Sequence, residues 1–288
     1  MEQDQDLSNV TARILERLRP VLLAERPNLM IVQGDTITAF AASLAAFYDR
    51  IPVAHVEAGL RTYNLDAPFP EEALRQMLTR LASLHFAPTP NNVNTLLREG
   101  VSPDRIVLTG NPVIDAVLWA RREIVRSRVN PLSTFIDQGT AERIERAEKL
   151  VLVTSHRREN VGANLSNICS ALEEVARTHP RVLLVFPVHP NPRIREYAVD
   201  RLDHLANVLL LPPLDYPAFI FLMNLCHVVV TDSGGVQEEA PALRKPVIVT
   251  RESTERQEGL DGDLVRLAGR TATELLRCCR GLWGSRRR

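Results

Sequence analysis

A turn of small residues near the end of the chain is the clearest candidate for ligand binding. The apolar run 228–230 leads through a threonine and an aspartate into Ser233, Gly234 and Gly235, and a helix-like stretch follows. Backbone N–H groups in such a turn can approach an anion closely, and the dipole of a following helix adds to the attraction. A pair of glutamates that includes Glu239 comes one turn later. This combination suits a nucleotide-sugar, although an ordinary tight connection between strand and helix is the alternative.

Three carboxylates in the first half of the chain occupy positions where chemistry often collects. Asp35 follows the apolar run 29–32, Glu57 follows the run 53–56, and Glu71 opens a helix-like stretch after a proline-rich loop. Residues that follow parallel strands meet at one edge of the sheet, and grouped carboxylates there can transfer protons. Each also has a structural explanation, because aspartate caps helices and glutamate favours the first helical turn.

Cationic and imidazole side chains follow two apolar runs of the second half. His156 and Arg157 come after the run 150–154, and His189 comes after the run 182–186. Together with the carboxylates and the small-residue turn, they could remove a proton from a sugar carbon while a diphosphate leaving group is held. A loop histidine on the surface, a buried structural histidine and a solvated arginine are the alternative readings.

Apolar runs alternate with helix-like stretches along the whole chain, which predicts doubly wound parallel sheets covered by helices on both faces. The expected strands are 29–32, 53–56, 85–87, 106–108, 150–154, 182–186, 208–211, 228–230 and 246–250. The expected helices include 7–24, 36–48, 71–83, 91–98, 113–124, 165–177, 192–201, 219–224 and 271–282, with Pro20 able to kink or split the first.

The pattern predicts two domains, 1–126 and 141–288. Residues 127–140 lack clear periodicity and are expected to form the linker. Two α/β domains of this kind place their ligand in the cleft between them.

Composition narrows the classes of partner. The 288 residues include 35 basic and 35 acidic side chains, so no net charge favours nucleic acid or an anionic membrane. Hydrophobic residues make up 45% of the chain and charged residues 24%, as in a soluble globular protein, and no apolar run is long enough to span a bilayer. The four cysteines show no zinc spacing, so we expect no metal and a reducing, cytoplasmic location.

At this point the motifs resemble those of one family, the non-hydrolysing bacterial UDP-N-acetylglucosamine 2-epimerases. The matching motifs are GDT (34–36), HVEAGLRT (55–62), PEE (70–72), FAPT (86–89), TGN (109–111), HRREN (156–160), HPNP (189–192), TDSGGVQEEAP (231–241) and TER (254–256). They run in family order over nearly the whole chain, which makes the set specific although GDT or SGG alone would be weak.

The resemblance implies a GT-B architecture with two Rossmann-like domains and a UDP-sugar in the central cleft. It implies reversible epimerisation at C2 of UDP-N-acetylglucosamine (UDP-GlcNAc) to UDP-N-acetylmannosamine (UDP-ManNAc), without a cofactor. UDP is eliminated to give a 2-acetamidoglucal intermediate and then added back. Carried over by motif, Asp35, Glu57 and Glu71 form the acid–base set, and His156 belongs to the same site. Which carboxylate takes the proton in each direction stays open.

The resemblance also assigns the substrate-binding residues. Ser233, Gly234 and Gly235 match the diphosphate-binding turn. Glu239 matches the carboxylate that binds the ribose, and Phe219 matches a residue that contacts uracil. Arg256 and His189 match residues that line the cleft. Arg157 and His189 match the region that binds a second, activating UDP-GlcNAc in many bacterial members. The family also commonly forms homodimers.

Two departures from the family leave alternatives open. Its opening strand, with an arginine and a lysine of the active site, has no counterpart before residue 6, and its last helices have none after residue 282. We therefore expect an open sheet edge or exposed apolar surface in the first domain. A UDP-sugar-binding protein with impaired catalysis and a hydrolysing epimerase that releases ManNAc remain alternative functions. A GT-B glycosyltransferase is disfavoured, because nothing in the chain indicates an acceptor site.

Overall fold

The chain folds into two compact units. The computed structural model describes residues 6–155, 163–260, 262–269, 271 and 273–278. By internal contacts the first unit is Met1–Asn111 and the second is Pro112–Arg288.

The division between the units lies earlier than the sequence suggested. Helix α5 (Pro112–Ser127), which was expected to close the first domain, packs against helices α9 and α10 of the second unit. The expected linker 127–140 is also packed there: it holds the turn η2 (Pro131–Thr134), and Leu132 is fully buried in the same core. Short helical turns show no periodicity in sequence, which is why this segment looked like a linker.

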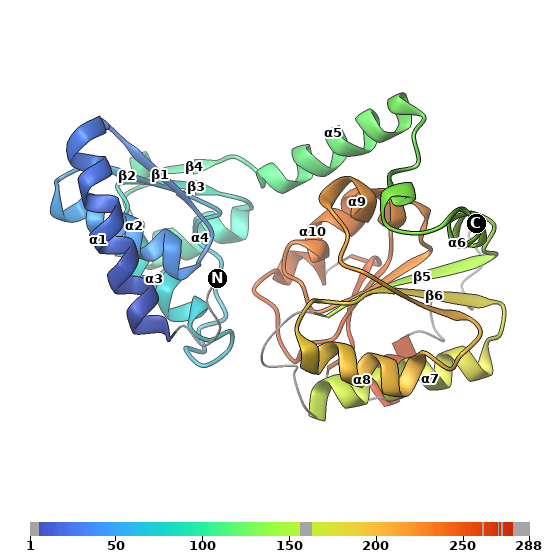
Figure 1. The fold of residues 1–288 in the computed structure, drawn as a ribbon. Helices are drawn as coiled ribbons and strands as arrows, with labels where there is room; N and C mark the ends of the chain where they lie inside the picture. The colour runs from blue at the N-terminus through green and yellow to red at the C-terminus, as the bar shows by residue number, and fades with distance from the viewer. Residues whose placement is uncertain (1–5, 156–162, 261, 270, 272, 279–288) are drawn as a thin grey trace. The chain divides into compact units, whose positions relative to one another are not determined.

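The first unit is a four-stranded parallel sheet with strand order β1-β2-β3-β4 (Figure 1). Its strands are β1 (Met30–Gln33), β2 (Val53–Val56), β3 (Leu84–Ala87) and β4 (Ile106–Leu108). Its helices are α1 (Leu7–Glu25), α2 (Ile37–Tyr48), α3 (Glu71–Leu81) and α4 (Pro90–Arg98), with the turn η1 (Pro103–Arg105). Because all four strands run in the same direction, their carboxyl ends lie along one edge of the sheet.

The second unit is a six-stranded parallel sheet with strand order β10-β9-β8-β5-β6-β7. Its strands are β5 (Lys149–Thr154), β6 (Val182–Pro187), β7 (Val208–Leu211), β8 (Val228–Thr231), β9 (Val247–Val249) and β10 (Val265–Leu267). Its other elements are α6 (Gln138–Glu145), α7 (Ala163–Thr178), α8 (Pro192–Leu202), α9 (Tyr216–Leu225), α10 (Val236–Ala242) and η4 (Gln257–Gly259). Helices α7 and α8 cover one face, and α9 and α10 cover the other (Figure 1).

The chain order in this second sheet creates a switch point. Strands β5, β6 and β7 build outward in one direction, and β8 then pairs with the other side of β5. Where the direction of building reverses, the connections after the two central strands diverge and leave a crevice in which α/β proteins bind ligands. The sequence-predicted turn after β8 therefore lies at the position that the topology favours for a ligand.

Local sequence explains where three of the helices begin. Thr36, Thr89 and Asp215 each accept a hydrogen bond from a backbone amide of the helix that follows, as N-cap residues do.

Pro20 lies inside α1, yet the helix is continuous from Leu7 to Glu25. The possible split at Pro20 is thus not found. Strand β10 was not expected, because exposed Arg266 interrupts its apolar pattern and it spans three residues only.

Strand β1 forms an open edge of the first sheet, as the resemblance led us to expect. It pairs with β2 on one side only within the described chain. Its inward side chain Val32 is buried, whereas Ile31 is 62% exposed. Alternation of this kind places one face of the strand on the core and leaves the other uncovered.

Some features are missing from the described part of the chain. No helix there has the length and apolar character needed to cross a membrane. Among the same residues, no three His, Cys, Asp or Glu side chains are grouped as metal ligands. The described cysteines, Cys169, Cys226 and Cys278, are buried free thiols.

Candidate functional site

In the first unit, Asp35 and Glu57 follow the carboxyl ends of the neighbouring strands β1 and β2. The register pairs the last residues of β1 and β2, and Gly34 follows with its amide donating to the Val56 carbonyl at 3.1 Å. Gly34 has φ +74°, which favours glycine, and a Cβ built on it would lie 3.5 Å from Glu57 Oε2. The close approach of this turn to Glu57 brings the following Asp35 to the same edge of the sheet.

The backbone at Glu57 is unusual in a way that fits a functional residue. Glu57 has φ +69°, a left-handed conformation that costs free energy for a residue with a Cβ. Its Oε1 accepts a hydrogen bond from Asn111 Nδ2 at 3.3 Å. Asn111 belongs to the TGN motif that the sequence singled out, so the structure joins two of the motifs at this carboxylate.

Glu71, the third predicted carboxylate, is the first residue of α3 and is partly buried. Its place in the first turn stabilises the helix by interaction with the macrodipole, which gives this residue a structural role whether or not it reacts. The same helix carries Arg75, whose Nη2 forms an ion pair with Asp35 Oδ2. Arg75 was not predicted as a site residue, although its i, i+3 spacing from Glu72 is a signal for an ion pair that sequence reading could have used.

Two buried histidines lie on neighbouring strands of the first sheet, and one of them bonds to the turn before Asp35. His55 on β2 donates from Nε2 to the Gly34 carbonyl at 2.8 Å, and His85 is its partner in the register with β3. Burial lowers the pKa of His55 to about 4, opposed by the hydrogen bond to Gly34. Burial also lowers the pKa of His85 to about 4, with the charge of His55 adding to the shift. Both rings are therefore neutral at pH 7 and act as structural, uncharged groups.

These lowered pKa values predict that acid destabilises the first unit. A histidine with a lower pKa in the folded state stabilises the fold above its unfolded pKa near 6.5, and this contribution is lost as the pH falls from about 6.5 to 4. The slope of the free energy of unfolding against pH approaches roughly 1.4 kcal/mol per pH unit for each such ring. We expect the free energy of unfolding, measured with urea, to fall less over this range in His55→Gln than in the unmodified protein. His204→Gln, which alters an exposed ring, should keep the original slope. Equal slopes for all three proteins would show that the buried rings are not responsible.

In the second unit, the turn after β8 is held by hydroxyl groups and a buried aspartate. Ser155 Oγ, at the end of β5, donates to Asp232 Oδ2 at 3.0 Å. The Ser233 amide donates to Thr231 Oγ1 at 3.0 Å, and the Val236 amide donates to Ser233 Oγ at 3.5 Å. The predicted turn Ser233–Gly235 thus sits on the switch point between β5 and β8.

Glu239 is the buried carboxylate of this site. It is 7% exposed on α10, and Tyr216 at the start of α9 donates its hydroxyl to Glu239 Oε1 at 3.0 Å. Burial raises the pKa of Glu239, while the bond from Tyr216 opposes the shift. The bond joins α9 to α10, so Phe219, partly buried on α9, lies on the helix that contacts Glu239. Tyr216 was missed, because a lone tyrosine carries no spacing signal in the sequence.

Arg256 lies against the same turn. Its Nε forms an ion pair with Glu238, and its Nη1 forms one with Glu255. A Cβ built on Gly234 would lie 2.7 Å from Arg256 Nη1, so the glycine leaves room for the guanidinium. The structure therefore brings together Gly234 and Arg256, which the sequence predicted separately.

Of the remaining predicted residues of the second unit, the structure describes only His189. His189 is exposed in the loop after β6, where its Nδ1 accepts from the Asn191 amide at 3.2 Å, and β6 is separated from β8 by β5. His156 and Arg157 lie outside the described residues.

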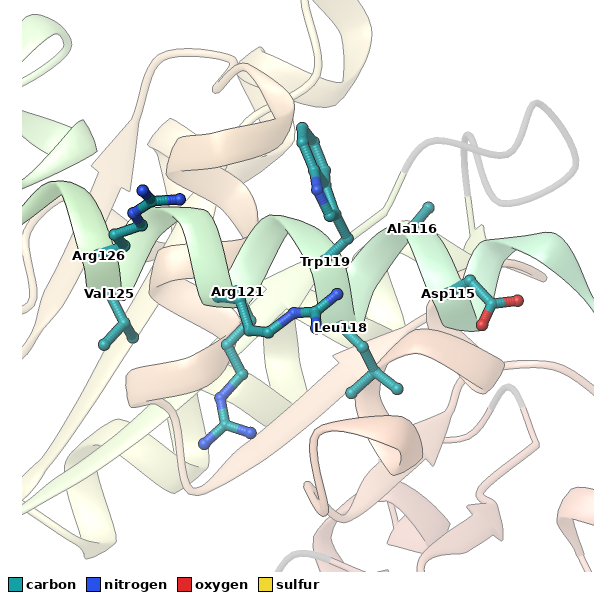
Figure 2. A pocket seen from close by; sticks show the side chains of 8 residues that line it. Asp115, Ala116, Leu118, Trp119, Arg121, Val125 and Arg126 are labelled. Carbon is teal, nitrogen blue, oxygen red and sulfur yellow. The ribbon is translucent and has the colours of Figure 1, made fainter.

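A surface hollow of about 1010 Å³ runs along α5 (Figure 2). Trp119 and Ala116 extend to one side of the helix, and Leu118 and Val125 extend to the other (Figure 2). Of the predicted site residues that the structure describes, none lines this hollow.

Comparison with known proteins agrees with the motifs. The model of the family described as UDP-N-acetylglucosamine 2-epimerase matches residues 1–287. The chain belongs to this family. The UDP-N-acetylglucosamine 2-epimerase of Yersinia pestis is 47% identical over 281 residues, which cover 96% of this chain and 73% of that enzyme. The enzyme of that name from Escherichia coli K12 is 47% identical over 274 residues, covering 93% and 71%.

Solved structures of family members share the fold. The UDP-GlcNAc 2-epimerase from Neisseria meningitidis, bound to UDP-GlcNAc, has a TM-score of 0.87 at 40% identity and covers 97% of this chain and 74% of its own. The UDP-GlcNAc 2-epimerase from Methanocaldococcus jannaschii, in complex with UDP-GlcNAc and UDP, has a TM-score of 0.86 at 31% identity and covers 99% and 77%. The expected α/β fold of GT-B type, with two Rossmann-like parallel sheets, is confirmed.

Proposed function

We propose that this protein converts UDP-GlcNAc to UDP-ManNAc, reversibly, by epimerisation at C2. The observation that carries the proposal is the edge of the first sheet, where Glu57 is hydrogen-bonded to Asn111 and Asp35 is paired with Arg75. Family members with UDP-GlcNAc or UDP bound support the choice of a nucleotide-sugar as substrate.

The proposed reaction balances without a cofactor. A carboxylate of the Asp35, Glu57 and Glu71 set removes the C2 proton. The electron pair of that bond forms the C1=C2 double bond, and the C1–O bond to UDP breaks. The products of this step are 2-acetamidoglucal and UDP. In the second step UDP oxygen adds back to C1 and a proton returns to C2 from the opposite face, so the net change is inversion at one carbon.

The second unit holds the leaving group in this proposal. Ser233, Gly234 and Gly235 bind the diphosphate, and Glu239 accepts hydrogen bonds from the ribose hydroxyls. Arg256 stabilises the negative charge that develops on UDP as the C1–O bond breaks. The proposal places Phe219 against uracil and gives His156, Arg157 and His189 contacts to the substrate.

Two further properties belong to the same proposal. A second molecule of UDP-GlcNAc binds near Arg157 and His189 as an activator, and the protein forms a homodimer. Activation predicts a sigmoidal dependence of rate on UDP-GlcNAc concentration.

Product analysis tests the proposed function. We expect purified protein given UDP-GlcNAc to form UDP-ManNAc, separated by anion-exchange chromatography, until the same ratio is reached from either side. Free ManNAc together with UDP would indicate a hydrolysing epimerase instead. UDP binding in calorimetry without any turnover would indicate a UDP-sugar-binding protein and would overturn the proposal.

A further inference from the structure

Glu72, the neighbour of the proposed catalytic Glu71, is a buried carboxylate that accepts four hydrogen bonds. Its side chain has no exposed area. Its Oε2 accepts from the Thr62 amide at 2.9 Å and from Arg75 Nη1 at 3.2 Å. Its Oε1 accepts from the Tyr63 amide at 3.1 Å and from Gln76 Nε2 at 2.9 Å. A buried carboxylate is costly unless its oxygens are paired, and here both are.

Two of these bonds hold the loop that carries Glu57. The loop leaves β2 at Glu57 with φ +69° and reaches Tyr63 with φ +59°, so two residues other than glycine take left-handed conformations within it. Such conformations persist only where surrounding contacts enforce them. The amides of Thr62 and Tyr63 both donate to Glu72, which fixes the middle of the loop between β2 and α3 to α3.

The bond from Arg75 connects Glu72 to Asp35, the other carboxylate at this edge of the first sheet. The guanidinium of Arg75 is buried, and it contacts Glu72 through Nη1 and Asp35 through Nη2. A planar guanidinium that bridges two carboxylates fixes the direction of both, which an ammonium group would not do. Through Arg75, Glu72 determines where the Asp35 carboxylate points.

We propose that Glu72 is a positioning residue that sets the geometry of Asp35 and Glu57 together. It acts at a distance on the reacting groups: on Glu57 through the amides of the loop, and on Asp35 through Arg75. The expected effect on kcat rests on the proposed function. The expected effect on the position of the loop and of Asp35 does not. Because misplacement of reacting groups by about 1 Å can cost on the order of a hundredfold in rate, the effect should appear in kcat.

Glu72→Gln is the direct test, because it keeps the size of the side chain and places an NH₂ group against donors. We expect kcat to fall by about tenfold to a hundredfold. The KM for UDP-GlcNAc and the calorimetric Kd for UDP should change by less than about threefold, since the UDP-binding residues belong to the other unit. Arg75→Lys should lower kcat in the same way while leaving the loop amides in place.

A matched control is present in the same unit. Glu99 accepts from Arg61 Nε at 2.8 Å and from Arg61 Nη2 at 2.8 Å, which makes a second arginine–carboxylate pair without contact to Asp35, in which the arginine is buried and the carboxylate is partly exposed. Glu99→Gln should lower the melting temperature, as Glu72→Gln does, but leave kcat within about threefold. A loss of kcat as large in Glu99→Gln would show general loosening of the unit and overturn the proposal.

Hydrogen exchange resolved by residue supplies a readout that does not need turnover. We expect the Thr62 and Tyr63 amides to exchange at least about tenfold faster in Glu72→Gln and at an unchanged rate in Glu99→Gln. If the unmodified protein makes no UDP-ManNAc, the proposed function is wrong. The exchange rates alone then decide whether Glu72 holds the loop in place. Unchanged protection of both amides in Glu72→Gln would overturn the inference, and so would unchanged kcat in Glu72→Gln and Arg75→Lys.

Discussion

Replacing Asp35 with asparagine is expected to lower kcat for epimerisation by about a thousandfold or more. Asparagine has the same shape but neither accepts nor delivers a proton at neutral pH, and it removes the charge that pairs with Arg75. The measurement is the initial rate of UDP-ManNAc formation at saturating UDP-GlcNAc. Binding of UDP should change little, because the residues assigned to UDP lie on the other unit.

The control for this change is Asp104→Asn. Asp104 is an exposed carboxylate of the same unit, in the turn η1, and it accepts a hydrogen bond from Ser102. We expect its replacement to leave kcat within about twofold. Full activity of Asp35→Asn beside an unaffected control would remove Asp35 from the acid–base set.

The second large effect concerns the affinity for UDP. Glu239→Gln should weaken UDP binding in calorimetry by roughly tenfold to a hundredfold, because a hydrogen bond to a charged group contributes about 1.5–3 kcal/mol. The carboxylate is buried, so water does not readily replace the lost acceptor. Glu252→Gln, at an exposed position, is the control and should bind UDP normally.

The same residue predicts a pH dependence. Burial raises the pKa of Glu239, so the carboxylate takes up a proton at a higher pH than an ordinary glutamate does. UDP affinity should therefore fall as the pH is lowered through this raised pKa, and the fall should be absent in Glu239→Gln. Equal affinities of the two proteins at neutral pH would mean that Glu239 does not contact the nucleotide.

Sequence patterns predicted the parallel-sheet elements well, because these strands are continuously apolar and sharply bounded. The run 53–56 is the strand β2, and the run 208–211 is β7. Prediction failed where length or polarity hid the pattern. Strand β10 has a polar residue at its centre, and the segment around Leu132 packs into a core through a short 3₁₀ turn.

The candidate site shows the same division. Asp35, Ser233 and Glu239 were predictable because they follow strands or open helices, where chain order alone fixes their place. Arg75 and Tyr216 were not, because their contacts with Asp35 and Glu239 join residues that lie far apart in the sequence. Contacts of this kind depend on how helices pack across a sheet, which no local pattern records.

In the proposed reaction, a carboxylate of the first unit exchanges the proton at C2 of UDP-GlcNAc. The direct measurement is proton NMR of the reaction in D₂O, with the C2 position followed in substrate and product. We expect the unmodified protein to form UDP-ManNAc that carries deuterium at C2, and Asp35→Asn to form none. UDP-ManNAc that keeps its C2 proton, or no product from protein that binds UDP, would contradict the proposed reaction.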